Sequence, residues 1–144
     1  MEKICNNCKH WQPNGSPLGV GYCRASDWVY RKPEQSCKNK FEPAKVYVSG
    51  PITGRLIEAR RQFAEAKVHL TDAGFDVFNP LENGLGVDEP WERHLAVDVL
   101  ELLACQAILP LPGWEQSQGA RLEMEVAKLV GLRIFAWQTE EPEV

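Results

Sequence analysis

Residues 45–137 alternate between short apolar runs and longer stretches with helical periodicity. The short runs are Lys45–Ser49, Phe75–Phe78, Ala107–Leu111 and Leu132–Trp137, and runs of this length between turn residues are typical of buried strands. Between them lie the stretches 55–72, 91–104 and 119–130, which we expect to be helices. Strands that alternate with helices predict right-handed crossovers and a parallel sheet with helices on both faces.

The first helical stretch shows its period most clearly. Its apolar residues at three- and four-residue steps are Leu56, Ala59, Phe63, Ala66 and Leu70. Gly74 follows where a C-terminal cap belongs. We expect a flavodoxin- or Rossmann-like α/β domain over residues 45–144 with strand order 2-1-3-4. In that order the loops after the first and third strands, Gly50–Gly54 and Pro112–Gly119, meet at one crevice.

Length and charge indicate two modules. A chain of 144 residues that is 44% hydrophobic can bury one core and still carry a small extra module. The formal net charge of -4 argues against a general nucleic-acid binder. Residues 1–44 have seven Lys/Arg against four Asp/Glu, whereas residues 45–144 have nine against sixteen. No apolar run reaches the roughly 20 residues of a membrane span, and the N-terminus lacks an apolar signal region, so we expect a cytoplasmic protein.

Four cysteines in residues 1–44 have the spacing of metal ligands. Cys5, Cys8, Cys23 and Cys37 form the pattern C-x2-C-x14-C-x13-C. Close cysteines in the cytosol are more often metal ligands than disulfides, and a module this small needs such a cross-link. Four thiolates would close a tetrahedral site, so we expect structural zinc. The spacing is also similar to that of high-potential iron–sulfur proteins, which leaves a cluster as an alternative, and two disulfides or free thiols as another.

The stretch from Ala107 to Glu123 carries the strongest functional signal. An apolar strand runs through a Pro/Gly-rich loop into a helix that Ser117 and Gly119 open. Open α/β sheets bind anionic or polar ligands at such points, because unpaired backbone N–H groups point outward there. The field of the helix favours the ionised form of a nearby carboxylate. We therefore expect an ionised Glu123 facing a pocket.

A second carboxylate, Asp98, lies inside an apolar stretch, 95–100. Two carboxylates that face one pocket suit cleavage of a glycosidic bond, since one attacks the anomeric carbon and the other protonates the leaving group. Structural roles are the alternative. Asp98 could lie solvated on the outer face of its helix, and Glu123 could stabilise the helix dipole or pair with Arg121 or Lys128.

Five motifs follow one another through residues 45–135. They are Tyr47–Gly54 (YVSGPITG), Phe78-Asn79-Pro80, Asp98, Leu109–Glu115 (LPLPGWE) and Ser117-x-Gly119-Ala120-x-x-Glu123. Together they resemble the nucleoside 2-deoxyribosyltransferase superfamily, and most closely its uncharacterised phage and bacterial branch. The resemblance implies an N-glycosidic hydrolase or transferase that acts on a nucleoside or nucleotide, needs no organic cofactor and forms a homo-oligomer.

The resemblance also implies roles for individual residues. Glu123 would be the nucleophile that forms a covalent sugar–enzyme intermediate, Asp98 would bind or protonate the departing base, and Tyr47 would line the sugar. The implied substrate-binding residues are Ser49, Gly50, Pro51, Ile52, Gly54, Asn79, Trp114, Ser117 and Gly119. Ser117 and Gly119 match positions that contact a 5′-phosphate, and Trp114 could stack on a base.

Other features of the sequence support alternative interpretations. Cys105-Gln106-Ala107 stands where the superfamily usually has an aspartate, and Cys105 itself is expected to be a buried residue at a helix end. His69 and His94 are expected to have structural roles. The alternative function is a non-catalytic one, in which the α/β domain binds a nucleotide and a metal-stabilised N-terminal domain docks on a partner. A nucleic-acid contact by residues 1–44 is a third reading.

Overall fold

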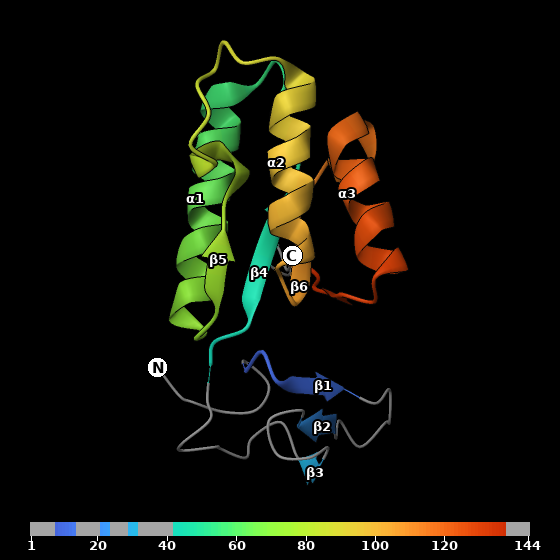
Figure 1. The fold of residues 1–144 in the computed structure, drawn as a ribbon. Coiled ribbons are helices and arrows are strands. Elements are labelled where there is room, and N and C mark those ends of the chain that lie inside the picture. Colours follow the sequence, from blue (N-terminus) through green and yellow to red (C-terminus); the bar gives the residue numbers. More distant parts are fainter. Residues whose placement is uncertain (1–7, 14–20, 24–28, 32–41, 138–144) are drawn as a thin grey trace.

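The computed structural model describes residues 8–13, 21–23, 29–31 and 42–137. These form a four-stranded sheet with three α-helices and a separate three-stranded sheet (Figure 1). The elements are β1 (Trp11–Pro13), β2 (Gly21–Cys23), β3 (Val29–Arg31), β4 (Lys45–Ser49), α1 (Leu56–Asp72), β5 (Asp76–Phe78), η3 (Pro80–Glu82), α2 (Trp91–Leu103), β6 (Ala107–Pro110), η4 (Trp114–Gln116), α3 (Gln118–Leu129) and β7 (Arg133–Ile134). Among the helices in these ranges, none combines the length and apolarity needed to cross a bilayer.

The larger sheet is parallel and has the order β5-β4-β6-β7. Counted along the chain, this is the order second, first, third, fourth. The register pairs Tyr47 of β4 with Phe78 of β5 on one side and with Ile108 of β6 on the other. The parallel α/β sheet expected from the alternating sequence is thereby confirmed.

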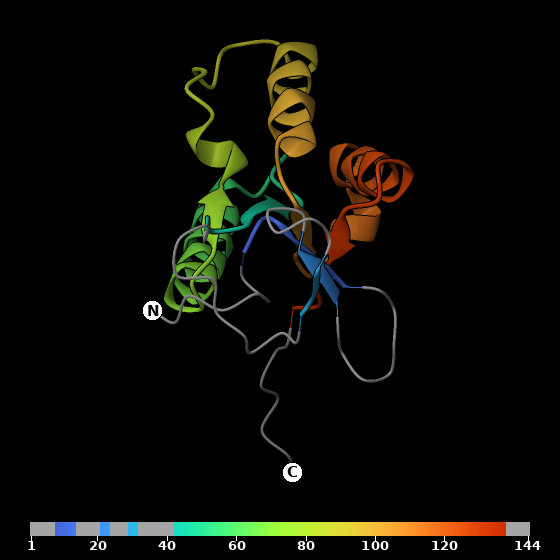
Figure 2. The same cartoon turned by 60° about the horizontal axis from the view of Figure 1, so that its bottom comes forward.

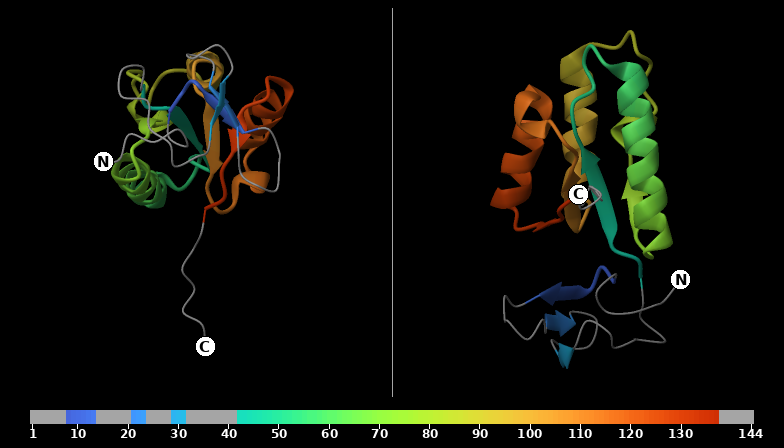
Figure 3. Two further views of the ribbon diagram at one scale, coloured as in Figure 1. Left: turned by 90° about the horizontal axis from the view of Figure 1, so that it is seen from below. Right: turned by 180° about the vertical axis from the view of Figure 1, so that it is seen from behind.

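Helices cover both faces of this sheet (Figures 1 and 3). Side chains alternate along a strand, so Val46 and Val48 pack with α1, whereas Tyr47 packs with α2 and α3. The α1 face carries an apolar cluster that includes the buried Phe63. The opposite face carries polar groups near the carboxyl end of β4, where Ser49 lies on the same side as Tyr47.

The sequence placed the helices within about one residue of their ends, but some details differ. Four of the five periodic residues of α1 are buried, whereas Leu56, at its first position, is 37% exposed. The last strand is shorter than expected, because only Arg133–Ile134 pairs as β7. Phe135 adds one more backbone hydrogen bond to Ile108, and the chain then packs against the α1 side of the core.

A second, antiparallel sheet lies at the amino ends of the parallel strands. Its order is β1-β2-β3, which the sequence did not predict. A bridge between Cys8 and Pro43, and a hydrogen bond from Lys9 N to Glu42 O, connect it to the approach to β4. Figure 2 turns this end forward and shows the small sheet beside the ends of the parallel strands. It therefore lies at the end of the domain opposite the glycine-rich loops.

Candidate functional site

The buried carboxylate of Glu123 accepts hydrogen bonds at both oxygens. The Tyr47 hydroxyl donates to Oε1 at 2.8 Å, and the Ser49 hydroxyl donates to Oε2 at 2.5 Å. Tyr47 and Ser49 are two residues apart on β4, so their side chains point to the same face of the sheet. Glu123 reaches this face from α3 and is only 6% exposed. The strand and helix thus fix the carboxylate in a single orientation.

Burial determines the charge state of Glu123. Loss of hydration raises its pKa to about 7, the hydrogen bonds from Ser49 and Tyr47 oppose this rise, and the charge of Asp98 adds to it. Burial thus opposes the ionised form that the helix field was expected to favour. The residue lies more than one turn inside α3, where the field of the helix end has faded, and desolvation outweighs it. Both protonation states are populated near neutral pH.

Asp98 lies on α2, is 8% exposed, and acts electrostatically on both Glu123 and Tyr47. The alternative of a solvated Asp98 on the outer helix face is therefore wrong. Its Oδ1 accepts a hydrogen bond from Asn83 Nδ2 at 3.0 Å. Burial raises the pKa of Asp98, and this hydrogen bond opposes the rise. The two carboxylates form a pair in which the charge of Asp98 favours the protonated form of Glu123.

The two glycine-rich loops meet beside this pair. A Cβ built on Gly113 would lie 3.5 Å from Pro51 Cγ, which places the loop after β6 against the loop after β4. Gly113 has a φ of +86°, a conformation that glycine adopts without strain. A Cβ on Gly50 would lie 3.1 Å from Leu111 Cβ, so a larger residue here would require Leu111 to shift by a few tenths of an ångström. The convergence predicted from topology is thus observed.

The start of α3 is built from one cap and one close contact. The Ser117 hydroxyl accepts the Ala120 N–H at 3.3 Å as an N-cap. A Cβ on Gly119 would lie 3.9 Å from the indole Nε1 of Trp91. Trp91 begins α2 and is 45% exposed, so a large aromatic surface lies beside this helix terminus. Only the neighbouring starts of α2 and α3 reveal this position of Trp91.

Trp114 and Ile52 lie on opposite faces of the sheet. Trp114 is partly buried against the cluster that contains Tyr47, whereas Ile52 packs on the α1 side. Gly54 is exposed with a φ of +77°. Asn79 is buried, and its amide accepts from Leu81 N and donates to Glu82, so its observed contacts cap η3.

The cysteines fall partly outside the described residues. Cys8 is buried, Cys23 lies at the end of β2, and Cys5 and Cys37 are not among the described ranges. Within those ranges no three His, Cys, Asp or Glu side chains gather as metal ligands, and the zinc site stays a prediction. Cys105 is buried as expected, and burial raises the pKa of its thiol to about 12, which makes the thiol unreactive.

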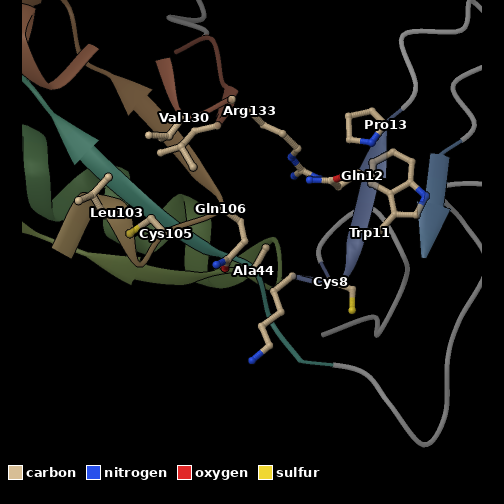
Figure 4. A pocket seen from close by; sticks show the side chains of 13 residues that line it. Cys8, Trp11, Gln12, Pro13, Ala44, Leu103, Cys105, Gln106, Val130 and Arg133 are labelled. Carbon is tan, nitrogen blue, oxygen red and sulfur yellow. The ribbon is translucent and has the colours of Figure 1, made fainter. Parts of the chain in front are cut away.

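A cavity of about 580 Å³ lies at the opposite end of the sheet (Figure 4). Its walls come from the small sheet, including Trp11, and from the amino ends of the parallel strands, including Gln106 and Arg133. The Gln106 amide is occupied by Lys45 N and by the Ala104 carbonyl. The cavity is therefore separate from the carboxylate pair.

Comparison with known proteins assigns the parallel domain to a sequence family. Residues 44–136 match the sequence profile of a family described as Domain of unknown function (DUF4406). The protein belongs to the DUF4406 family. The matched residues contain the whole parallel sheet and both carboxylates. A search of curated proteins finds no match.

A solved structure shows the fold of this DUF4406 domain. The domain is similar to a 2-desoxiribosyltransferase from Leishmania mexicana, with a TM-score of 0.53 and 17% identity over 68% of this chain and 66% of that chain. A Clostridium botulinum CMP N-glycosidase, BcmB, has a TM-score of 0.48 and 16% identity over 68% and 71%. The DUF4406 chain thus spans slightly less than two thirds of the Leishmania protein and has a deoxyribosyltransferase-like fold, as its motifs implied.

Proposed function

We propose that this protein cleaves or transfers the N-glycosidic bond of a nucleoside or nucleotide, with Glu123 as the nucleophile. The observation that carries the proposal is a buried glutamate whose two oxygens are held by hydroxyls, with a second buried carboxylate acting on it. The fold shared with a protein named as a 2-desoxiribosyltransferase supports the same reaction class.

Each carboxylate then has one role. A Glu123 oxygen attacks C1′ of the sugar, the C1′–N bond breaks, and its electron pair leaves with the base. Asp98 gives its proton to the departing base, a role suited to a carboxyl whose pKa burial raises. Water, or a second base, next attacks C1′, frees Glu123 and returns a proton to Asp98.

Tyr47 and Ser49 orient the nucleophile and favour its ionised form. Their hydrogen bonds stabilise the carboxylate form and lower its pKa against the effect of burial. The neighbouring loops supply the rest of the pocket. We assign the sugar and any phosphate to the loop after β4 and to the backbone N–H groups at the start of α3, and the base to the side of Trp114 and Asp98.

Base release tests this function directly. Purified protein is incubated with nucleosides, nucleoside monophosphates and nicotinamide dinucleotide, and free base is measured by chromatography. Glu123→Gln should lose several orders of magnitude in turnover and still bind the substrate. Glu125→Gln is the matched control, because it is the same change at an exposed position on the same helix. Absence of release from every compound, with binding of one of them, would instead support a binding module.

For residues 1–44 we propose a structural zinc site. The β1–β2 register places Cys23 opposite Trp11, and Trp11 N donates to the Cys8 carbonyl at 3.2 Å. The backbones of Cys8 and Cys23 are thus at the same end of one hairpin, as two ligands of one ion require. Metal analysis of protein purified without added metal should find one zinc per chain, and folded protein without zinc or iron would refute the proposal.

A further inference from the structure

Asn83 links three groups around the carboxylate site. Its Oδ1 accepts the Leu85 N–H at 3.0 Å. Its Nδ2 lies 3.0 Å from Asp98 Oδ1 and 3.1 Å from His94 Nδ1. A backbone N–H needs an acceptor and a carboxylate oxygen needs a donor, so this amide has only one consistent orientation. Both hydrogens of the amide nitrogen are then assigned, one to Asp98 and one to His94.

This orientation determines the tautomer of His94. Because Asn83 donates to Nδ1, that nitrogen must be unprotonated, and Nε2 must carry the hydrogen. His94 Nε2 lies 3.1 Å from the Gly86 carbonyl, which accepts this hydrogen. His94 thus links Asn83 to the loop that follows Asn83. In this tautomer both ring nitrogens form hydrogen bonds.

We propose that His94 is a positioning residue which, through Asn83, holds the Asp98 carboxylate in one orientation. The inference rests on the proposed function, in which Asp98 serves the departing base. His94 and Asp98 are four residues apart on α2 and therefore share a face of the helix. Without the acceptor at Nδ1, one hydrogen of the Asn83 amide loses its partner, and the amide is then held only by the Leu85 N–H and by Asp98.

The geometry gives each Asp98 oxygen a separate use. Among the residues that the structure describes, Asn83 is the hydrogen-bond donor to Asp98, and it contacts Oδ1 alone. No described residue donates to Oδ2, so this oxygen is available to the substrate. The titratable groups that face Asp98 are His94 and Glu101 on its own helix and Glu123 on α3. None of them replaces the directional hydrogen bond from Asn83.

Two substitutions distinguish the contributions of the two ring nitrogens of His94. His94→Asn places an amide oxygen close to the position of Nδ1 and so keeps the acceptor for Asn83. His94→Gln reaches the position of Nε2 and keeps the contact to Gly86 but loses that acceptor. We expect His94→Gln to lower kcat about 10- to 100-fold with a smaller change in KM, as loss of an outer partner of a catalytic group does. His94→Asn should stay within about threefold of wild type. Equal losses in both variants would overturn the proposal.

A measurement without turnover decides the same point. The titration of Asp98 is followed by carboxyl-carbon NMR in wild type, in both His94 variants and in Asn83→Ala, with circular dichroism to verify folding. Both His94 variants lose the electrostatic effect of the imidazole on Asp98, but only His94→Gln also loses the Asn83 hydrogen bond, so the pKa of Asp98 should be higher in His94→Gln than in His94→Asn and should also rise in Asn83→Ala. Identical titrations in all four proteins would refute the positioning role. If the wild type releases no base, the proposed function fails, whereas this titration still tests the link.

Discussion

Glu123→Gln should make the folded protein more stable at alkaline pH while it abolishes turnover. The pKa of Glu123 rises from 4.5 to about 7 on folding, mainly because the side chain is buried. A tenfold change in proton affinity corresponds to about 1.4 kcal/mol, so the folded protein holds this proton more tightly than the unfolded chain by about 3 kcal/mol. The same amount is lost from stability when the carboxyl ionises in both states.

The sign and pH range follow from the two pKa values. Below pH 4.5 the carboxyl is protonated in the folded and the unfolded chain, and the penalty is absent. As pH rises from 4.5 through about 7, the unfolded chain ionises first and the folded state loses stability. Above that range the penalty is complete. A neutral glutamine keeps an acceptor for Tyr47 and avoids this penalty, so it should gain about 1–3 kcal/mol at pH 8.

Urea unfolding of the full chain measures this effect. The free energy of unfolding is determined at pH 5 and pH 8 for wild type, Glu123→Gln and the control Glu125→Gln. We expect a gain for Glu123→Gln at pH 8, a much smaller one at pH 5, and no pH-dependent difference for Glu125→Gln. A Glu123→Gln protein that is less stable than wild type at pH 8, or whose difference is the same at both pH values, would refute the reasoning.

Three further outcomes follow from the same contacts. Tyr47→Phe removes a hydrogen bond that lowers the pKa of Glu123, so the acid limb of the pH profile of kcat/KM should move to higher pH. Gly50→Ala should lower the free energy of unfolding by about 1–3 kcal/mol in urea, because its Cβ would lie 3.1 Å from Leu111 Cβ; no loss would show that the loop relaxes. Ser117→Ala should lower the free energy of unfolding by about 0.5–2 kcal/mol, because α3 loses its N-cap. Calorimetry that shows no change would contradict a stabilising role of this cap.

Much of the parallel domain was determined by local sequence. The strand Lys45–Ser49 has the bounds that the sequence predicted, and the helices agree within about one residue. Apolar period, glycine placement and run length are local properties, and a parallel sheet built from alternating elements leaves few topologies. The meeting of the two glycine-rich loops followed from this topology. The motifs also indicated Glu123 and Asp98 as residues worth testing.

The tertiary structure alone decided how those residues behave. The sequence suggested an ionised Glu123, whereas burial among α2, α3 and the sheet raises its pKa to about 7. Nothing local distinguishes Asn83 as the donor to Asp98, or His94 as the residue that orients Asn83. Desolvation and hydrogen-bond direction depend on side chains brought together from distant parts of the chain, and a local pattern does not contain these distances. The sequence therefore determined the strands, the helices and the candidate carboxylates, and the packing of helices on the sheet set their charge and orientation.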